Sequence, residues 1–148
     1  GMERFVELSR LLIKNHGYQI LGCFSEKEQI IAKSLYDQVK GVFIHAGPLR
    51  KSIALIYKAD LMIDNASGPS HISSALDIPT IVLMGPQDYK NTYYDEDVHR
   101  ENSFFFYRDV RCRDLLMSRC LPPNPCQNRV CQDYSVEEVY KKVQELLI

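Results

Sequence analysis

The residues with the clearest chemical potential lie between Leu61 and Pro86, in the run LMIDNASGPSHISSALDIPTIVLMGP. The pattern predicts a strand that ends at Asp64, a tight turn, and a helix that begins at Gly68 or Pro69. Such a turn directs several backbone N–H groups at one point, at the positive end of the helix dipole. The segment is therefore a candidate binding site for a phosphate or a pyrophosphate.

Four side chains or backbone positions of this turn suggest separate roles. Gly68 has no Cβ, so a ligand can approach its backbone closely. Ser67 suits the cap position of the helix and could donate its hydroxyl to a phosphate oxygen. Pro69 fits the first helical turn, where a missing N–H costs little. His71 could bind a phosphate or a sugar in its neutral form, which the helix N-terminus favours, and a purely structural role has equal weight.

The rest of the chain supplies the elements that must position this turn. Short apolar runs predict strands over 18–24, 42–45, 61–64, 80–84 and 103–110. Hydrophobic periodicity predicts helices over 3–14, 25–36, 49–58 and 69–76, the second opened by the capping box Ser25–Glu28. In the third helix, Leu49, Ile53 and Ile56 are expected to face inward. Strands that alternate with helices predict a Rossmann-like α/β fold, with a parallel sheet flanked by helices.

The length of 148 residues suits a single domain over 1–148. An irregular segment rich in Cys and Pro is expected over 111–132. A second capping box at Ser135 opens a final amphipathic helix over 135–147.

Four cysteines cluster in the irregular segment: Cys112, Cys120, Cys126 and Cys131. Their spacing is not a repeated CxxC pair, so it gives only a weak indication of a zinc site. Reduced thiols and disulfides are the alternatives, and reduced thiols are favoured for a cytosolic protein. No metal is therefore assigned.

The composition excludes several classes of function. Hydrophobic residues make up 45% of the chain, charged residues 25%, and the formal net charge is −1, so a nucleic-acid partner is not expected. No apolar run approaches the roughly 18 residues of a membrane span, and no signal peptide is recognised. We expect a cytoplasmic protein, with peripheral association at the inner membrane left open.

The run Asn65–His71, with the helix Ile72–Leu76 and the later Ile78–Thr80 and Gly85–Pro86, resembles the signature of glycosyltransferase family 9. These are the ADP-heptose:lipopolysaccharide heptosyltransferases and their relatives. The resemblance spans nearly the whole chain, since Gly17-Tyr18, Leu21-Gly22, Glu26, the cysteine cluster and the helix near Ser135 fall where the family has equivalent features.

The resemblance implies the C-terminal, donor-binding half of a two-domain GT-B enzyme of lipopolysaccharide or envelope polysaccharide synthesis. Transfer in the family is metal-independent, needs no cofactor and inverts the anomeric centre, with an ADP-heptose-like nucleotide-sugar as substrate. Glu26 matches a residue that binds the ribose hydroxyls. The implied donor-binding residues are Ser67, Gly68, Pro69, His71, Glu26, Gly85, Pro86 and Gln87.

Three departures from the family pattern affect these expectations. Ala66 stands where the family has Asp, and Asp64, within the strand, is not expected to substitute for it. Gln87 replaces the Thr that follows Gly-Pro. The acceptor half and the first strand, with its phosphate-binding Lys, are absent, so no catalytic residue is assigned in this chain. We expect it not to transfer sugar alone, whether it is an expressed fragment, a shortened gene product or half of a split enzyme.

Two other functions are weighed against this one. A sugar-nucleotide 2-epimerase-like domain would have Asp-Ser-Gly-Gly before an acidic helix, and Pro69 and His71 argue against it. A non-catalytic domain that binds a nucleotide or a partner protein is favoured by Ala66 and by the missing half. The sequence leaves open the base, the sugar, the acceptor and the oligomeric state.

Overall fold

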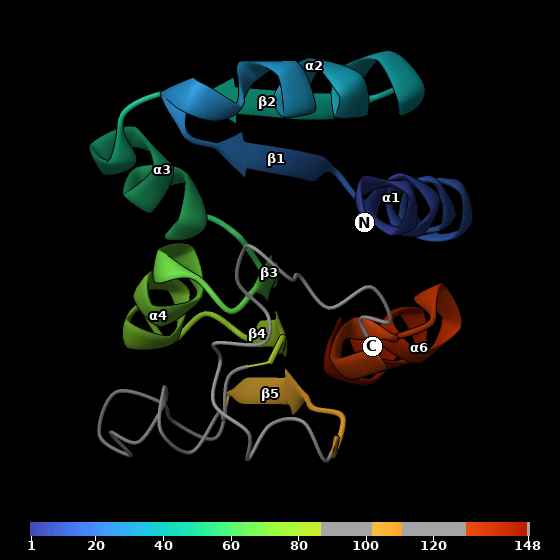
Figure 1. Ribbon diagram of the computed structural model, residues 1–148. Helices are drawn as coiled ribbons and strands as arrows, with labels where there is room; N and C mark the ends of the chain where they lie inside the picture. The colour runs from blue at the N-terminus through green and yellow to red at the C-terminus, as the bar shows by residue number, and fades with distance from the viewer. Residues whose placement is uncertain (87–101, 111–129, 148) are drawn as a thin grey trace, which may run out of the picture. The chain divides into compact units, whose positions relative to one another are not determined.

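The computed structural model describes residues 1–86, 102–110 and 130–147 (Figure 1). The chain divides into two compact units: unit 1 contains Gly1–Leu55 and Ser135–Ile148, and unit 2 contains Ile56–Tyr134. Every strand pairing in the described residues is parallel, in one sheet ordered β1-β2 and another ordered β3-β4-β5. Helices accompany both sheets, which confirms the predicted α/β class with parallel strands flanked by helices.

The elements follow the predicted order with small shifts at their ends. The strands are β1 (Ile20–Phe24), β2 (Val42–Ala46), β3 (Met62–Asn65), β4 (Thr80–Leu83) and β5 (Ser103–Phe106). The helices are α1 (Met2–His16), α2 (Gln29–Gln38), α3 (Leu49–Ile56), α4 (Gly68–Ala75) and α6 (Val136–Leu147), with 3-10 turns η1 (Glu26–Glu28) and η4 (Val130–Gln132).

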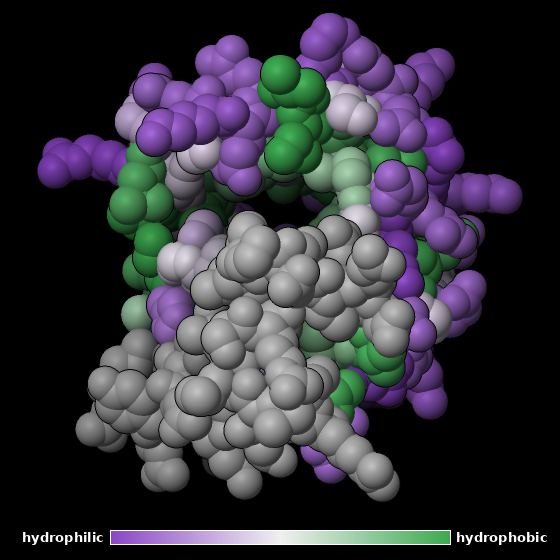
Figure 2. All heavy atoms as spheres, viewed as in Figure 1, coloured by the Kyte–Doolittle hydropathy of each residue, from purple (hydrophilic) through white to green (hydrophobic). Residues whose placement is uncertain are grey.

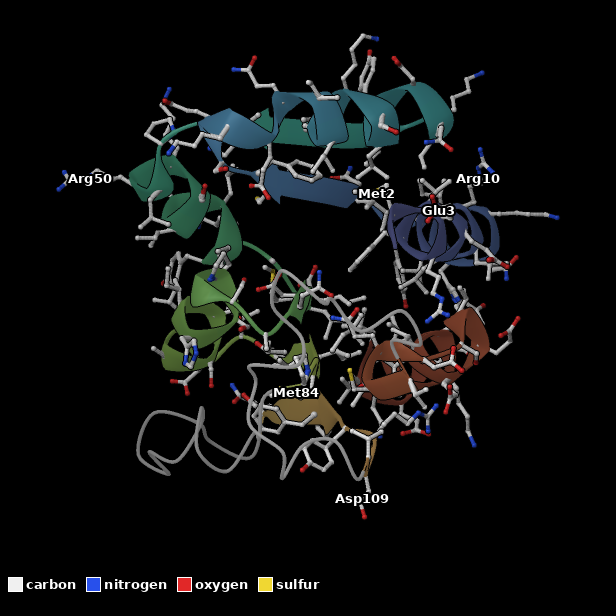
Figure 3. The ribbon with its side chains drawn as sticks, viewed as in Figure 1. Met2, Glu3, Arg10, Arg50, Met84 and Asp109 are labelled. Atoms are coloured by element: carbon white, nitrogen blue, oxygen red, sulfur yellow. The ribbon has the colours of Figure 1, made fainter. Side chains whose placement is uncertain are left out.

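Unit 1 is built around a small apolar core between helices and the β1-β2 sheet. The buried residues of this core are Val6, Leu35, Val39 and Val42, with Met2, Ile13, Ile20, Phe24 and Ile44 packed against them. Removing these side chains from water stabilises the unit by roughly 25 cal/mol per Å² of apolar surface. Arg10, labelled in Figure 3, fastens α1 to α2 by donating to the Gln38 carbonyl at 2.6 and 3.2 Å.

Helix α6 also belongs to unit 1, where it packs with α1. The Tyr140 hydroxyl lies 2.8 Å from His16 Nε2 and accepts a hydrogen bond from Asn15 Nδ2 at 3.0 Å. The buried face of α6 is apolar and contains Val136, Val139 and Val143. These contacts explain why a helix at the end of the chain joins the N-terminal unit.

Both predicted capping boxes form. The Ser25 amide donates to the Glu28 carboxylate at 2.9 Å, and the hydroxyl of Ser25 donates to the same oxygen at 2.6 Å. These bonds hold the pKa of Glu28 below its usual value. At the second box, the Ser135 amide donates to Glu138 at 2.8 Å and the Glu138 amide donates to the Ser135 hydroxyl at 3.1 Å.

Unit 2 is a three-stranded parallel sheet with α4 beside it. The register places Asn65 opposite Leu83 and Leu83 opposite Phe106, so the carboxyl ends of all three strands lie at one edge. A small apolar core contains Val82 and Met84, with Ala66, Phe105 and Tyr107 packed against it.

Hydroxyl groups attach α4 to this sheet. Ser73 Oγ and Thr80 Oγ1 lie 2.8 Å apart, as do Ser74 Oγ and Ser103 Oγ. The residues Ser73, Ser74 and Thr80 are each at most 1% exposed. Small, hydrogen-bonded side chains let the helix approach β4 and β5 closely without burying an unsatisfied polar group.

One inward-facing prediction is wrong. Leu49 begins α3 and is 57% exposed, whereas Ile56, at the other end of the helix, is buried. Other large hydrophobic side chains are exposed on unit 1, among them Ile30 on α2 and Phe43 on β2. Figure 2 shows hydrophobic side chains among the hydrophilic ones on the face in view. In the described ranges, no helix is both long and apolar enough to cross a membrane.

Candidate functional site

The candidate anion-binding turn joins β3 to α4, as predicted. Ser67 occupies the cap position with extended backbone angles, φ −148° and ψ 176°, and α4 begins at Gly68 with Pro69 next. The Ser67 amide donates to Ser70 Oγ at 3.3 Å, and the hydroxyl of Ser70 donates back to the Ser67 carbonyl at 2.7 Å. This reciprocal pair holds the entry to the helix in one conformation.

Gly68 presents an open backbone at the start of α4. Among the described residues, a Cβ atom built on this residue would meet no atom within 4 Å outside its chain neighbours and the helix's own backbone. Its backbone does not need glycine for conformational reasons, because its φ angle is not in the left-handed region, unlike those of Gly17 and Gly41. The open space is therefore available to a ligand that approaches the helix N-terminus closely.

His71 lies in the first turn of α4 and is half-buried. Burial lowers the pKa of its imidazole, because a charged ring is less well solvated there. The predicted preference for the neutral form is confirmed in direction, although its cause is desolvation. A neutral imidazole can both donate and accept a hydrogen bond, so it suits either a phosphate or a sugar hydroxyl.

Asp64 is the residue of this turn that sequence reasoning excluded. Its Oδ2 accepts the hydroxyl hydrogen of Ser67 at 2.5 Å and the amide hydrogen of Ser70 at 3.1 Å. Asp64 thus places a carboxylate at the start of α4, and whether it substitutes for the family Asp in donor binding stays a prediction. Asp64 lies one residue before the end of β3, and its side chain reaches the Ser70 amide in the first turn of α4. The one indication of this contact in the sequence was the spacing of three positions between Asp64 and Ser67.

This arrangement alters the expected role of Ser67. Its hydroxyl hydrogen is directed at Asp64, so the hydroxyl cannot donate to a phosphate while that bond persists. The Ser70 amide is also engaged by Asp64. Gly68 and His71 consequently carry most of the evidence for ligand binding at this turn.

Gly85 and Pro86 lie at the same edge of the sheet, immediately after β4. The Ala66 amide donates to the Leu83 carbonyl at 3.3 Å, which ties the turn after β3 to the end of β4. The structure thus brings Gly85 and Pro86 to the edge that carries Ser67, Gly68 and Pro69, as parallel strands require.

A residue from the end of unit 2 also reaches this edge. The Tyr134 hydroxyl lies 2.6 Å from the carbonyl of Met84, which Figure 3 labels beside β4, and 2.8 Å from that of Cys131. A Cβ on Gly85 would lie 3.2 Å from Gln132 Nε2. Sequence reasoning missed Tyr134 and Gln132, because no spacing connects residues about 50 positions apart.

The remaining predicted residues belong to unit 1, to η4 of unit 2, or to segments outside the described ranges. Glu26 is exposed in η1, directly after β1 of unit 1. Cys131 lies in η4 and is half-buried. Gln87, Cys112, Cys120 and Cys126 lie outside the described residues, so the zinc prediction stays a prediction.

His45 is the penultimate residue of β2 in unit 1 and has one unusual feature. Its Nε2 is buried and has no hydrogen-bond partner among the residues that the structure describes. The ring lies over Gly47, where a Cβ would be 3.0 Å from the imidazole Cε1. An unsatisfied buried nitrogen destabilises a fold by about 1–3 kcal/mol, so this atom is a candidate for contact with a ligand.

Sequence comparison places these observations in a family. The model of glycosyltransferase family 9 (heptosyltransferase) matches residues 1–102, which include the whole turn from β3 to α4 and Gly85-Pro86. Lipooligosaccharide heptosyltransferase 2 of Campylobacter jejuni serotype O:2 is 24% identical over 150 residues, covering 97% of this chain and 44% of the relative. The serotype O:6 protein of the same name is 24% identical over 149 residues, covering 96% and 45%. The chain spans less than half the length of these relatives.

Solved structures share the fold. ADP-heptose lps heptosyltransferase II of E. coli superimposes with a TM-score of 0.75 at 19% identity, covering 99% of this chain and 41% of that one. A glycosyl transferase family 9 protein from Veillonella parvula gives 0.76 at 19% identity, with the same coverage. The resemblance seen in the sequence is confirmed. The chain belongs to glycosyltransferase family 9, the heptosyltransferase family.

Proposed function

We propose that this chain is the nucleotide-sugar-binding half of a metal-independent, inverting glycosyltransferase of lipopolysaccharide or envelope polysaccharide synthesis. The observation that carries the proposal is the open backbone of Gly68 at the N-terminus of α4, within the segment that matches the family. The names of the relatives, heptosyltransferase and ADP-heptose heptosyltransferase, favour an ADP-heptose-like donor.

The turn offers chemistry that suits the diphosphate of such a donor. The N-terminus of α4 carries a positive partial charge, which stabilises an anion and a departing diphosphate without a metal ion. His71, whose pKa is lowered by partial burial, can donate to a phosphate or sugar oxygen from the first turn of the helix. Gly85 and Pro86 line the same strand edge, where ligands bind in open parallel sheets.

Glycosyl transfer also needs a general base and an oriented acceptor, and these supply a large part of the rate. In the proposal they come from the other half of the enzyme, since the relatives are more than twice as long as this chain. We therefore expect nucleotide-sugar binding without transfer when this chain is assayed alone. Sugar transfer by the isolated chain would contradict this division of labour.

Calorimetry of the chain with ADP, UDP and GDP tests the proposal. Saturable binding of one nucleotide, weakened at least about tenfold in His71→Ala, supports a donor site at α4 and identifies the base. The control is Tyr57→Ala, which removes an exposed side chain of unit 2 and should leave affinity unchanged. Absence of binding at millimolar nucleotide would instead support a non-catalytic domain that has the fold of the family without its nucleotide-binding function.

A further inference from the structure

Asp64 is a charged side chain at the candidate turn that the resemblance to the family does not explain. Its Oδ2 accepts hydrogen bonds from the Ser67 hydroxyl at 2.5 Å and from the Ser70 amide at 3.1 Å. Both donors belong to the N-terminus of α4, where the helix dipole favours negative charge. A carboxylate therefore already takes part of the place that a ligand phosphate would occupy.

The donor and the product of the proposed reaction differ in charge at this place. The second phosphate of a nucleotide-sugar is joined to the first phosphate by an anhydride bond and to the sugar by an ester bond, and it carries one negative charge. In the nucleoside diphosphate product the same phosphate is terminal, and with a second pKa of about 6 it carries nearly two charges at pH 8. A neighbouring carboxylate repels the product more strongly than the donor.

We infer that Asp64 is a specificity-determining residue that weakens binding of the nucleoside diphosphate product relative to the nucleotide-sugar donor, and so favours product release. The inference rests on the proposed function, because it places the donor diphosphate at the N-terminus of α4. For two unit charges about 6 Å apart at an effective dielectric constant of about 40, the extra charge of the product costs about tenfold in affinity.

Asp64→Asn tests the charge while keeping an oxygen that can accept from Ser67 and Ser70. The matched control is Asp60→Asn, which removes the same charge from an exposed position of unit 2 just before β3, at the opposite end of that strand. Affinities are measured by calorimetry at pH 8 without divalent cations, which would neutralise the extra charge. The ligand pairs are ADP with ADP-glucose, UDP with UDP-glucose and GDP with GDP-mannose.

The expected result is that Asp64→Asn raises the affinity for the nucleoside diphosphate about tenfold more than the affinity for the matching nucleotide-sugar. Asp60→Asn should change the ratio of the two affinities by less than about twofold, because the strand separates it from the turn. Asp64→Ser, a second neutral variant, should give the same change in ratio, and it replaces Asp64→Asn if that variant melts below the assay temperature.

Three results overturn the inference: an equal change for both ligands, no change, or weaker binding of the nucleoside diphosphate by the neutral variants. Failure of the wild type and both variants to bind any of the six ligands overturns it as well. Gly68→Ala separates this inference from the proposed function. If Gly68→Ala weakens binding at least about tenfold and the Asp64 variants leave the ratio unchanged, the donor site stands and only the role of Asp64 fails. Unchanged binding in Gly68→Ala means that the site itself is elsewhere.

Discussion

Gly68→Ala should separate ligand binding from stability in this protein. Among the described residues, the new methyl group meets no atom within 4 Å outside its chain neighbours and the helix backbone. The backbone of Gly68 is compatible with alanine, so we expect no clash and no strain. Alanine is favoured over glycine in a helix by about 0.5–1 kcal/mol, with a smaller gain at the first position. The free energy of unfolding should therefore stay the same or rise by up to about 1 kcal/mol. That change corresponds to a melting-temperature increase of about 2–4 °C or less for a chain of this size.

Binding should respond in the opposite direction. A methyl group at the point of closest approach pushes the ligand off the helix N-terminus, and we expect nucleotide affinity to fall at least about tenfold, or about 1.4 kcal/mol. Urea denaturation measures stability and calorimetry measures affinity on the same preparations. Gly17→Ala is the contrasting control: Gly17 has φ +68°, so alanine should cost about 1 kcal/mol of stability and leave affinity unchanged. Wild-type affinity in Gly68→Ala, or a loss of stability above about 1 kcal/mol, would refute the reasoning.

Other parts of the structure give three further predictions. Tyr134→Phe should lower the free energy of unfolding by about 1–3 kcal/mol, because the hydroxyl of this buried residue is 2.6 Å from the Met84 carbonyl; a melting temperature equal to wild type would contradict this. His45→Leu should raise stability by about 1 kcal/mol in urea denaturation, since Nε2 is buried and unpartnered among the described residues; a decrease would show that the ring is satisfied in solution. Burial lowers the pKa of His71, so the unfolded chain binds more protons and stability should fall as the pH drops below about 6.5. Between about pH 7.5 and 5 the melting temperature of His71→Gln should fall less steeply than that of the wild type. Identical pH profiles for the two proteins would show that His71 is not the group responsible.

The turn that forms the candidate site was largely predictable because its determinants are local. Strand β3 is followed within a few residues by the Ser67 cap, Gly68 and Pro69. Each of these residues acts on its neighbours through short-range hydrogen bonds or backbone geometry. The same holds for the capping boxes at Ser25 and Ser135, whose partners lie three residues away. The alternation of strands with helices then limits the fold to a parallel α/β arrangement.

The charge at the site was less predictable from residue types. The family signature has its carboxylate next to the serine, where this chain has Ala66, and Asp64 was not expected to substitute for it. The structure shows that Asp64, two residues earlier, directs its carboxylate to Ser67 and Ser70. Side-chain direction at the last residues of a strand depends on the path of the following turn, which residue spacing alone does not give.

Local residue patterns were enough to predict the elements, their order, the start of α4 and the family. Folding alone brings together residues that are distant in the chain: Tyr134 with the carbonyl of Met84, Gln132 beside Gly85, and the serines of α4 with Thr80 and Ser103. Caps and helix starts arise from contacts within about four residues, whereas contacts across the chain follow from strand register and helix packing. Those depend on the whole folded arrangement, so no short window of sequence specifies them.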